Sequence, residues 1–406
     1  MKIIFLNRFF YPDHSATSQL LADLAFHLAD AGWDVSVICS RQRYDDPAAE
    51  LPATEQVNSV QVYRVWTSRF GRHNLIGRGL DYLSFYLSAA WRLYCLAREG
   101  DIVVAKTDPP MISVVAAWVA RLRRANLVNW LQDLFPEVAT ALNIKGFDGA
   151  LGRTLVGLRN RSLRQAKCNV VLGELMRQRL VMEGIAEGHI RVVHNWADGD
   201  AITPLLQAQN PLRKEWELEG RFVVGYSGNL GRAHEFTTLL DAAEFLQQEE
   251  AIVFLFIGGG PQLPMVQKAV QERGLGNCMF RPYQPRERLQ ESLGLADLHL
   301  VVLRPELEGL IVPSKFYGIA AAGRPTVYVG DLQGEVAQII MGGDAGTTVA
   351  IGNGEGLAEK IVGLYQNPVR CARLGQNARL LFEQRYSKQR ALQAWCTILN
   401  ACGRKP

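Results

Sequence analysis

The sequence contains no long uncharged apolar segment and no leader-like beginning. Its most apolar long stretch, residues 75–97, is interrupted by Arg78, Asp81 and Arg92, so a membrane-spanning helix is not expected. Met1 leads directly into a strand-like run at residues 2–7, so no signal peptide is expected either. Both absences favour a chain that does not cross a membrane.

Cysteine is scarce and scattered. The 406 residues include 7 cysteines, an odd number, and no two of them form a Cys-x-x-Cys pair. This pattern argues against a zinc site or a disulfide framework and is typical of a reducing cytosol. We therefore expect a cytoplasmic protein. The composition, 48% apolar and 21% charged, is typical of globular proteins, and the length suits two domains.

Acidic residues are few in one part of the chain. Residues 1–198 hold 23 Lys and Arg against 19 Asp and Glu, whereas residues 199–406 hold 21 of each, so the net charge of +4 lies in the first half. Between residues 64 and 98 only Asp81 is acidic. The basic residues of that stretch are Arg64, Arg69, Arg72, Arg78, Arg92 and Arg98. Such a surface suits anionic lipid, a phosphorylated acceptor or nucleic acid.

Strand-like and helix-like patterns alternate along the chain. One series of β-rich apolar runs lies at residues 2–7, 34–40, 60–65, 101–106, 126–131, 168–173 and 190–195. A second lies at 222–228, 252–260, 278–283, 298–303, 325–330 and 347–352. Alternation of this kind predicts parallel sheets covered by helices on both faces. We expect two doubly wound α/β domains, divided near residues 196–220, with a cleft between them. Residues 45–58 resemble an exposed polar loop.

Two turns at predicted strand ends suit a phosphate group. Ser314 and Lys315 follow the run at 298–303 and open a helix, where free N–H groups, a hydroxyl and a positive charge attract an anion. The segment Gly228-Asn229-Leu230-Gly231 follows the run at 222–228, and Arg232 comes next. Glycines let a diphosphate approach the backbone, and an arginine can bind it through two hydrogen bonds. Ser314 equally suits an ordinary helix cap.

Two further candidates lie in the first half of the chain. Ser15 stands at the start of the first long helix, either as a phosphate contact or as a helix cap. Asp133 follows the run at 126–131 and faces the expected cleft. It suits a general base or a substrate-orienting group, and equally a helix cap with Pro136 in the first turn.

Together these segments resemble a GT-B glycosyltransferase of family four, in the branch that builds bacterial exopolysaccharides and cell-surface glycans. The matching blocks occur in order along almost the whole chain: FFYPD, KTDPP, QDLFPE, VVHNWAD, YSGNLG, RPYQPRE, VPSKFYGIAAAGRP and the pair GE at 334–335. The ordered series is more specific than any one block.

The resemblance implies two Rossmann-like domains, an acceptor-side domain at 1–198 and a nucleotide-sugar-binding domain at 199–386. A C-terminal helix within 387–406 would pack back on the first. It implies a retaining, metal-independent hexosyltransferase without a cofactor, whose donor is a nucleotide sugar, usually a UDP-sugar. The acceptor would be lipid-linked or a polysaccharide, with no nucleic acid partner.

The resemblance also assigns residues. The phosphate contacts map to Gly228, Asn229, Arg232, Ser314 and Lys315, and the base lies near Tyr283. Arg232 and Lys315 would offset the charge of the leaving diphosphate, the task that a metal ion performs elsewhere.

The sequence departs from the family pattern at three places. The second of two family glutamates, which usually holds the ribose, is replaced by Gly318; Glu308 could contact the donor sugar and Glu335 the ribose. A glycine pair of the first loop is Ser15-Ala16 here. Gln132, which precedes Asp133, stands where many members have a histidine, so the resemblance does not assign the catalytic base.

The acceptor side has two interpretations. Residues 75–97 carry Tyr82, Phe85, Tyr86, Trp91 and Tyr94 beside arginines. An interfacial helix at the inner face of a membrane, giving peripheral membrane contact, has this composition. A buried domain helix has it too, and we favour the core for most of its length. Two other functions remain open, a nucleotide-sugar epimerase and a catalytically silent nucleotide-sugar-binding subunit.

Overall fold

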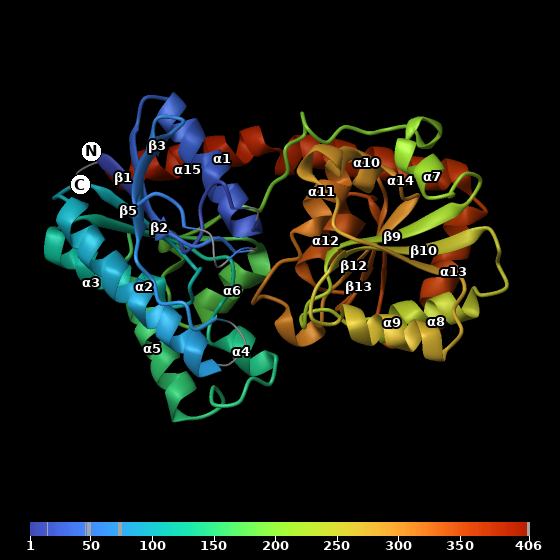
Figure 1. The fold of residues 1–406 in the computed structure, drawn as a ribbon, viewed down its shortest axis with the longest axis horizontal. Coiled ribbons are helices and arrows are strands. Elements are labelled where there is room, and N and C mark those ends of the chain that lie inside the picture. Colours follow the sequence, from blue (N-terminus) through green and yellow to red (C-terminus); the bar gives the residue numbers. More distant parts are fainter. Residues whose placement is uncertain (14, 45, 47–49, 72–74, 404–406) are drawn as a thin grey trace. The chain divides into compact units, whose positions relative to one another are not determined.

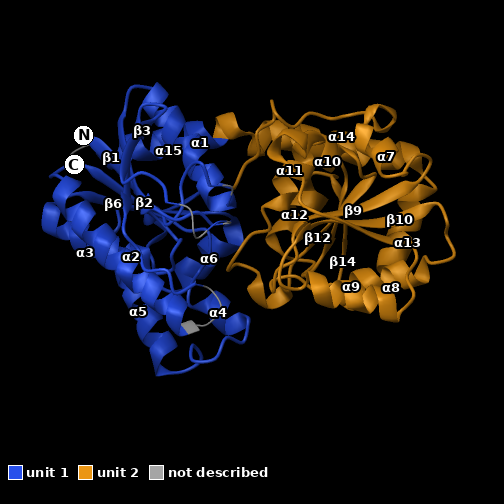
Figure 2. Cartoon of the chain, viewed as in Figure 1, with its two compact units in different colours: residues 1–194, 391–406 blue, residues 195–390 orange. Residues whose placement is uncertain are grey.

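The computed structural model describes residues 1–13, 15–44, 46, 50–71 and 75–403. The chain forms two compact units (Figure 2). Unit 1 comprises Met1–His194 together with Ala391–Pro406, and unit 2 comprises Asn195–Arg390. Each unit contains one sheet with helices on its faces.

The sheet of unit 1 has the strand order β3-β4-β2-β1-β5-β6-β7-β8. Its strands are β1 (Lys2–Leu6), β2 (Asp34–Ser40), β3 (Thr54–Val57), β4 (Val60–Val65), β5 (Ile102–Lys106), β6 (Asn126–Trp130), β7 (Cys168–Val171) and β8 (Ile190–Val192). All neighbours are parallel except β3 and β4. The parallel doubly wound arrangement predicted from the alternating pattern is confirmed.

The edge strand β3 was not predicted, because residues 45–58 were expected to form a loop. The strand is polar and half exposed, so it lacks the apolar run that marks the other strands. Asn58 and Ser59 have φ of 43° and 62°, the left-handed pair that a two-residue hairpin turn requires. Residues 45 and 47–49 of that stretch, and Arg72 of the basic stretch, lie outside the described residues.

The helices of unit 1 are α1 (Ala16–Asp30), α2 (Leu75–Leu96), α3 (Ile112–Arg123), α4 (Glu137–Ala141), α5 (Ala150–Gln165), α6 (Glu174–Met182) and most of α15 (Lys388–Gly403). Helix α2 packs against α3, and α3 packs against α5 (Figure 1). On the inner side of α2, Phe85, Ala89 and Leu93 are buried in one apolar cluster with Ile4 and Leu6 of β1.

Helix α15 begins in unit 2 and continues into unit 1. Its Trp395 is fully buried and packs against Trp130 of β6, with ring centroids 4.6 Å apart. Near its end, Lys167 Nζ donates to the carbonyl oxygen of Cys402 at 3.2 Å. These contacts hold the C-terminal part of α15 against the sheet of unit 1.

Unit 2 has an all-parallel sheet in the order β11-β10-β9-β12-β13-β14. Its strands are β9 (Phe222–Asn229), β10 (Ile252–Gly259), β11 (Cys278–Arg281), β12 (Leu298–Val302), β13 (Thr326–Val329) and β14 (Gly346–Val349). Its helices are α7 (Pro211–Glu215), α8 (Thr237–Phe245), α9 (Leu263–Glu272), α10 (Leu289–Gly294), α11 (Lys315–Ala321), α12 (Glu335–Gly342), α13 (Gly354–Tyr365) and α14 (Pro368–Leu381), followed by a π-helical turn at Phe382–Tyr386. Because the strands are parallel, the loops that follow them gather at one edge of the sheet.

Candidate functional site

The ends of β9 and β10 in unit 2 approach too closely for side chains. Gly228 has φ of 121°, and a Cβ atom there would stand 3.0 Å from Cε of Lys315. Gly258 has φ of 140°, and a Cβ atom there would lie 2.1 Å from the carbonyl oxygen of Gly228. Only glycine fits both the conformation and the space. The result is a stretch of bare backbone covered by one lysine.

Lys315 is the first residue of α11 and reaches over this backbone. Its Nζ donates to the carbonyl oxygen of Asn229 at 3.2 Å and to the hydroxyl of Tyr226, and it lies 3.8 Å from the centroid of the Tyr226 ring. Among the described residues no carboxylate forms an ion pair with it. Burial therefore lowers the pKa of Lys315 well below its ordinary value. A desolvated amine without a counter-charge is a ready partner for an incoming anion.

His234 completes this cluster, and the sequence analysis missed it. Its Nδ1 lies 2.7 Å from the carbonyl oxygen of Val302, which can only accept, so Nδ1 carries the proton. The lone pair of Nε2 then faces Lys315 Nζ at 3.5 Å. Burial, and secondly the charge of Lys315, lower the pKa of His234 to about 3. His234 is thus a neutral acceptor that orients Lys315; the only sequence signal was its position two residues after Arg232.

The other residues that were predicted to bind the nucleotide-sugar donor lie at the same edge of the unit 2 sheet. Arg232 is exposed on the loop after β9 and makes no ion pair with any described residue. Ser314 directly precedes α11, but its side chain makes no capping hydrogen bond. The Tyr283 ring lies against Gly259, and its hydroxyl donates to the Gly259 carbonyl oxygen at 3.4 Å. Gly259 pairs with Asn229 in the sheet, so Tyr283 borders the same backbone.

Glu308 and Glu335 lie together beyond β12 and β13. Glu308 accepts the backbone N–H of Glu335 at 3.2 Å and the hydroxyl of Tyr328. Gly334 makes room for this carboxylate, because a Cβ atom there would lie 2.2 Å from Glu308 Oε1. Burial raises the pKa of Glu308. These contacts of Glu308 hold the start of α12 in place. If Glu308 also contacts the substrate, it does so in addition to this structural role.

Replacing Glu308 separates these two tasks. If Glu308 contacts the donor sugar, Glu308→Gln should lower turnover at least tenfold while the melting temperature changes little, because glutamine keeps the shape and one acceptor. The matched control is Tyr328→Phe, which removes the hydroxyl but leaves the carboxylate. It should lower the free energy of unfolding by about 1–3 kcal/mol and leave turnover within about threefold. Turnover of Glu308→Gln equal to wild type would assign Glu308 to the fold alone.

In unit 1, Asp133 follows β6 and is largely enclosed. It accepts a hydrogen bond from Thr107, while its Oδ1 is buried without a partner. Burial raises the pKa of Asp133 to about 7, and the charge of Asp108 adds a smaller effect in the same direction. The hydrogen bond from Thr107 lowers the pKa but does not offset the effect of burial. Helix α4 starts at Glu137 with Pro136 at its cap, so Asp133 is not the helix cap. A carboxyl group with a pKa near neutrality suits proton transfer.

Two other polar residues of unit 1, Glu137 and Ser15, make structural contacts. Glu137 forms a bidentate ion pair with buried Arg159, at 2.7 and 2.9 Å. Ser15 is at the N-cap position of α1, but its hydroxyl makes no capping bond and is buried without a partner. Its N–H donates to Asp13 Oδ1 at 2.8 Å. The structure places Ser15 and Asp133 at the carboxyl edge of the unit 1 sheet.

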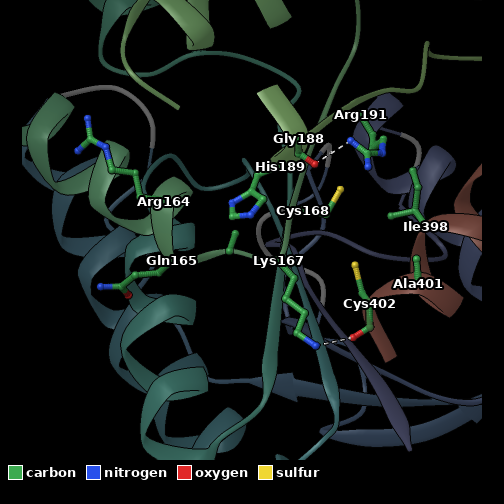
Figure 3. Close-up of a pocket in the computed structure, with 11 residues that line it drawn as sticks. Arg164, Gln165, Lys167, Cys168, Gly188, His189, Arg191, Ile398, Ala401 and Cys402 are labelled. Carbon is green, nitrogen blue, oxygen red and sulfur yellow. Dashed lines mark hydrogen bonds between the residues drawn. The ribbon is translucent and has the colours of Figure 1, made fainter. Parts of the chain in front are cut away.

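A separate cavity of about 330 Å³ opens at the opposite, amino-terminal edge of the unit 1 sheet (Figure 3). It is lined by Lys167, Cys168, His189, Arg191 and Cys402, among others. The thiols of Cys168 and Cys402 face each other there, and a hydrogen bond from Cys168 lowers the pKa of Cys402. No predicted site residue lies in this cavity. Within the described part of the chain, no group of three or more His, Cys, Asp and Glu side chains is arranged to hold a metal ion.

Comparison with known proteins matches both halves of the chain to glycosyltransferase families. Residues 16–196 match the family described as "Glycosyl transferase 4-like domain", and residues 208–381 match "Glycosyl transferases group 1". The chain belongs to the GT-B glycosyltransferases of family four. The family interpretation of the sequence motifs is thereby confirmed.

Two curated relatives cover most of this glycosyltransferase. One is "Probable glycosyltransferase WbjE" of Pseudomonas aeruginosa, 26% identical over 82% of this chain and 82% of its own length. The other is WcaI of Escherichia coli strain K12, 25% identical over 84% of this chain and 86% of its own, with the provisional name of a colanic acid biosynthesis glycosyl transferase.

A solved structure supports the fold of this glycosyltransferase. Alr3699/HepE of Anabaena, in a complex with UDP and glucose, covers 98% of this chain and 99% of its own with a TM-score of 0.74 and 18% identity. The GT-B fold, two Rossmann-like domains with parallel sheets, is confirmed.

Proposed function

We propose that this glycosyltransferase moves a hexose from a UDP-sugar to a lipid-linked or polysaccharide acceptor in exopolysaccharide or cell-surface glycan biosynthesis, in peripheral contact with the membrane. The observation that carries the proposal is Lys315, a desolvated lysine that has no ion-pair partner among the described residues and lies above the bare backbone of Gly228. The name of WcaI, which refers to colanic acid biosynthesis, supports a role in exopolysaccharide synthesis. The UDP bound to HepE supports a UDP-sugar as the donor. An epimerase or a silent binding subunit has no comparable support.

The residues of unit 2 can bind a nucleoside diphosphate. The backbone of Gly228 and Asn229 would receive the phosphates, with Ser314 adding a hydroxyl and Tyr283 bordering the base. Arg232 and Lys315 would neutralise the diphosphate as the sugar departs, because fixed positive charge stabilises a leaving anion without a metal ion. Glu335 would hold the ribose and Glu308 the donor sugar. Transfer would proceed with retention of configuration.

In unit 1, Asp133 would act on the acceptor. Its partnerless Oδ1 can accept the proton of an acceptor hydroxyl, and its raised pKa lets it hold that proton near neutral pH. The buried Ser15 hydroxyl, also without a partner, would donate to a phosphate oxygen of the substrate.

A thermal-shift comparison in EDTA tests the donor site. UDP should raise the melting temperature, with a stabilisation of about 2.7 kcal/mol at one hundred times the dissociation constant. GDP and ADP should do so only at much higher concentration. Arg232→Ala should weaken the UDP shift at least tenfold in concentration, because it removes a solvent-exposed cation without touching the fold.

The matched control is Arg221→Ala, an exposed arginine at the amino end of β9, remote from the strand ends. It should leave the UDP shift unchanged. If Arg232→Ala responds to UDP as the wild type does, the diphosphate lies elsewhere. Formation of a glycoside, rather than interconversion of the donor, then separates a transferase from an epimerase.

A further inference from the structure

Two cysteines that are far apart in the sequence meet at the cavity of unit 1. Cys168 is the first residue of β7, and Cys402 lies in the last turn of α15. Both residues are buried, at 5% and 6% exposed, and both border the cavity (Figure 3). The thiol of Cys168 donates a hydrogen bond to the sulfur of Cys402. Both are free thiols, so the structure describes the reduced pair.

The end of α15 is held beside β7 by contacts other than the thiols. Lys167, which directly precedes Cys168, donates from Nζ to the carbonyl oxygen of Cys402 at 3.2 Å. Trp395, two turns earlier in α15, packs on Trp130 of β6. A disulfide requires a particular separation and dihedral angle of the two cysteines. Because Cys402 lies close to a chain end, its helical turn can adjust to that geometry without disturbing the rest of the fold.

The surroundings of the two thiols carry positive charge. Among the described residues that line the cavity, none is acidic. The basic residues of the lining are Arg164, Lys167, His189 and Arg191. Positive charge beside a cysteine favours the thiolate, which is the form that reacts with oxidants. The cavity, of about 330 Å³, gives a small oxidant room beside the pair.

Other buried cysteines of the chain have a different environment. Burial raises the pKa of Cys39 to about 12 and that of Cys371 to about 11, as for cysteines that only fill an apolar core. In contrast, the hydrogen bond from Cys168, and then the charges of Lys167 and Arg191, lower the pKa of Cys402. The same hydrogen bond, and then burial, raise the pKa of Cys168. One thiol is therefore suited to attack, and its partner keeps the proton.

We propose that Cys168 and Cys402 form a reversible disulfide between β7 and α15 when the protein meets hydrogen peroxide. The Cys402 thiolate attacks one peroxide oxygen, the O–O bond breaks, and Cys402 becomes a sulfenic acid while hydroxide leaves and is protonated to water. The Cys168 sulfur then attacks the Cys402 sulfur. The S–S bond forms as the S–O bond breaks, and the hydroxyl group leaves with the Cys168 proton as a second water. Two thiols lose two electrons, which the peroxide gains, and a dithiol reductant reverses the reaction.

Peroxide treatment of the full chain tests this inference directly. After treatment, alkylation of the remaining thiols and digestion, mass spectrometry should detect one cross-linked peptide that contains Cys168 and Cys402 and that disappears on reduction with dithiothreitol. The melting temperature of the oxidised protein should be about 5 °C higher than that of the reduced protein, because the bond closes a very long loop of the unfolded chain. Dithiothreitol should restore the lower value.

Single variants test the different roles of the two thiols. Cys168→Ala should accumulate the sulfenic acid at Cys402, which dimedone traps, because the thiol that resolves it is missing. Cys402→Ala should yield no dimedone adduct at Cys168, because Cys168 keeps its proton. The matched control is Cys95→Ala, which removes an exposed cysteine of α2 and should cross-link as the wild type does. Melting curves of the reduced variants show that each is folded, and the wild-type cross-link needs no substitution.

Three outcomes would overturn the inference. One is the absence of the cross-link in wild type at a peroxide dose that already oxidises exposed Cys95 in the same sample. Another is a dimedone adduct at Cys168 in Cys402→Ala with none at Cys402 in Cys168→Ala. The third is a disulfide that joins Cys168 or Cys402 to another cysteine instead. The cavity contains none of the proposed donor residues, so every variant should keep the UDP-induced thermal shift whichever result is obtained.

Discussion

Lys315→Met is expected to abolish the UDP-induced thermal shift and to lower turnover by about 10²–10³-fold, the usual cost of removing one fixed charge-stabilising group. The reason is geometric. Nζ is held over the Gly228–Asn229 backbone by Asn229 O, Tyr226 and His234, so it stands ready where a diphosphate would lie. Methionine keeps the length and apolar body of the side chain but removes the amino group, and with it the positive charge and the hydrogen bonds that Nζ donates.

The same variant should not destabilise the protein without ligand. Because burial lowers the pKa of Lys315, the folded state binds that proton less tightly than the unfolded state does. Between the pKa of Lys315 in the folded state and the ordinary lysine pKa, the unfolded state binds more protons, so the free energy of unfolding of the wild type increases as pH rises. Lys315→Met lacks that dependence and should melt at or above the wild-type temperature at pH 7.

Melting curves with and without UDP, together with initial rates, provide the measurement. The control is Lys268→Met, an exposed lysine of α9 that pairs with Glu272 at 3.5 Å. It should change neither quantity. Loss of activity accompanied by a large fall in the melting temperature would mean that Lys315 serves the fold, and the proposed diphosphate site would then lose its main support.

Asp133→Asn is expected to lower kcat/KM by about 10²–10⁴-fold, the usual contribution of a general acid or base. In the wild type, activity should rise with pH through about 7, because the base must be deprotonated and the pKa of Asp133 is raised to about 7. The variant should lose this acidic limb. Initial rates between pH 5 and 9 at saturating and at limiting acceptor separate an effect on turnover from an effect on binding.

The same substitution should stabilise the fold at alkaline pH. The folded carboxyl holds its proton more tightly than the unfolded one, so wild-type stability falls as pH rises from about 4 to about 7 and stays low above that. Asparagine removes this penalty, which is at most about 4 kcal/mol for a shift of about three pKa units. Wild type and variant should therefore unfold alike below pH 4 and differ most near pH 8.

Asp148→Asn is the matched control, since Asp148 is exposed in the loop before α5. It should affect neither the pH profile nor the melting temperature. If Asp133→Asn keeps the acidic limb of the rate profile, then another group takes the proton, whatever the stability measurement shows. A lower melting temperature for Asp133→Asn at pH 8 would instead show that its carboxylate is stabilised in the fold.

The sequence by itself determined the strand–helix alternation, and with it two parallel sheets, because apolar runs and helical periodicity are local properties of the chain. It also identified the family, since ordered blocks such as YSGNLG and VPSKFYG need no geometry to be recognised. The sequence did not predict strand β3, because its residues are polar and its pairing with β4 depends on the turn at Asn58 and Ser59.

Only the tertiary structure decided which polar residues act together. His234 became part of the site because β12 supplies the carbonyl oxygen of Val302, a partner 68 positions away that fixes its tautomer. Glu308 and Glu335 are in contact because the ends of β12 and β13 lie side by side. Asp133 is not a helix cap, because α4 begins only at Glu137. Likewise, the sequence shows which residues of α2 are apolar, but only the packing of the rest of the chain decides which of them are buried and which face water.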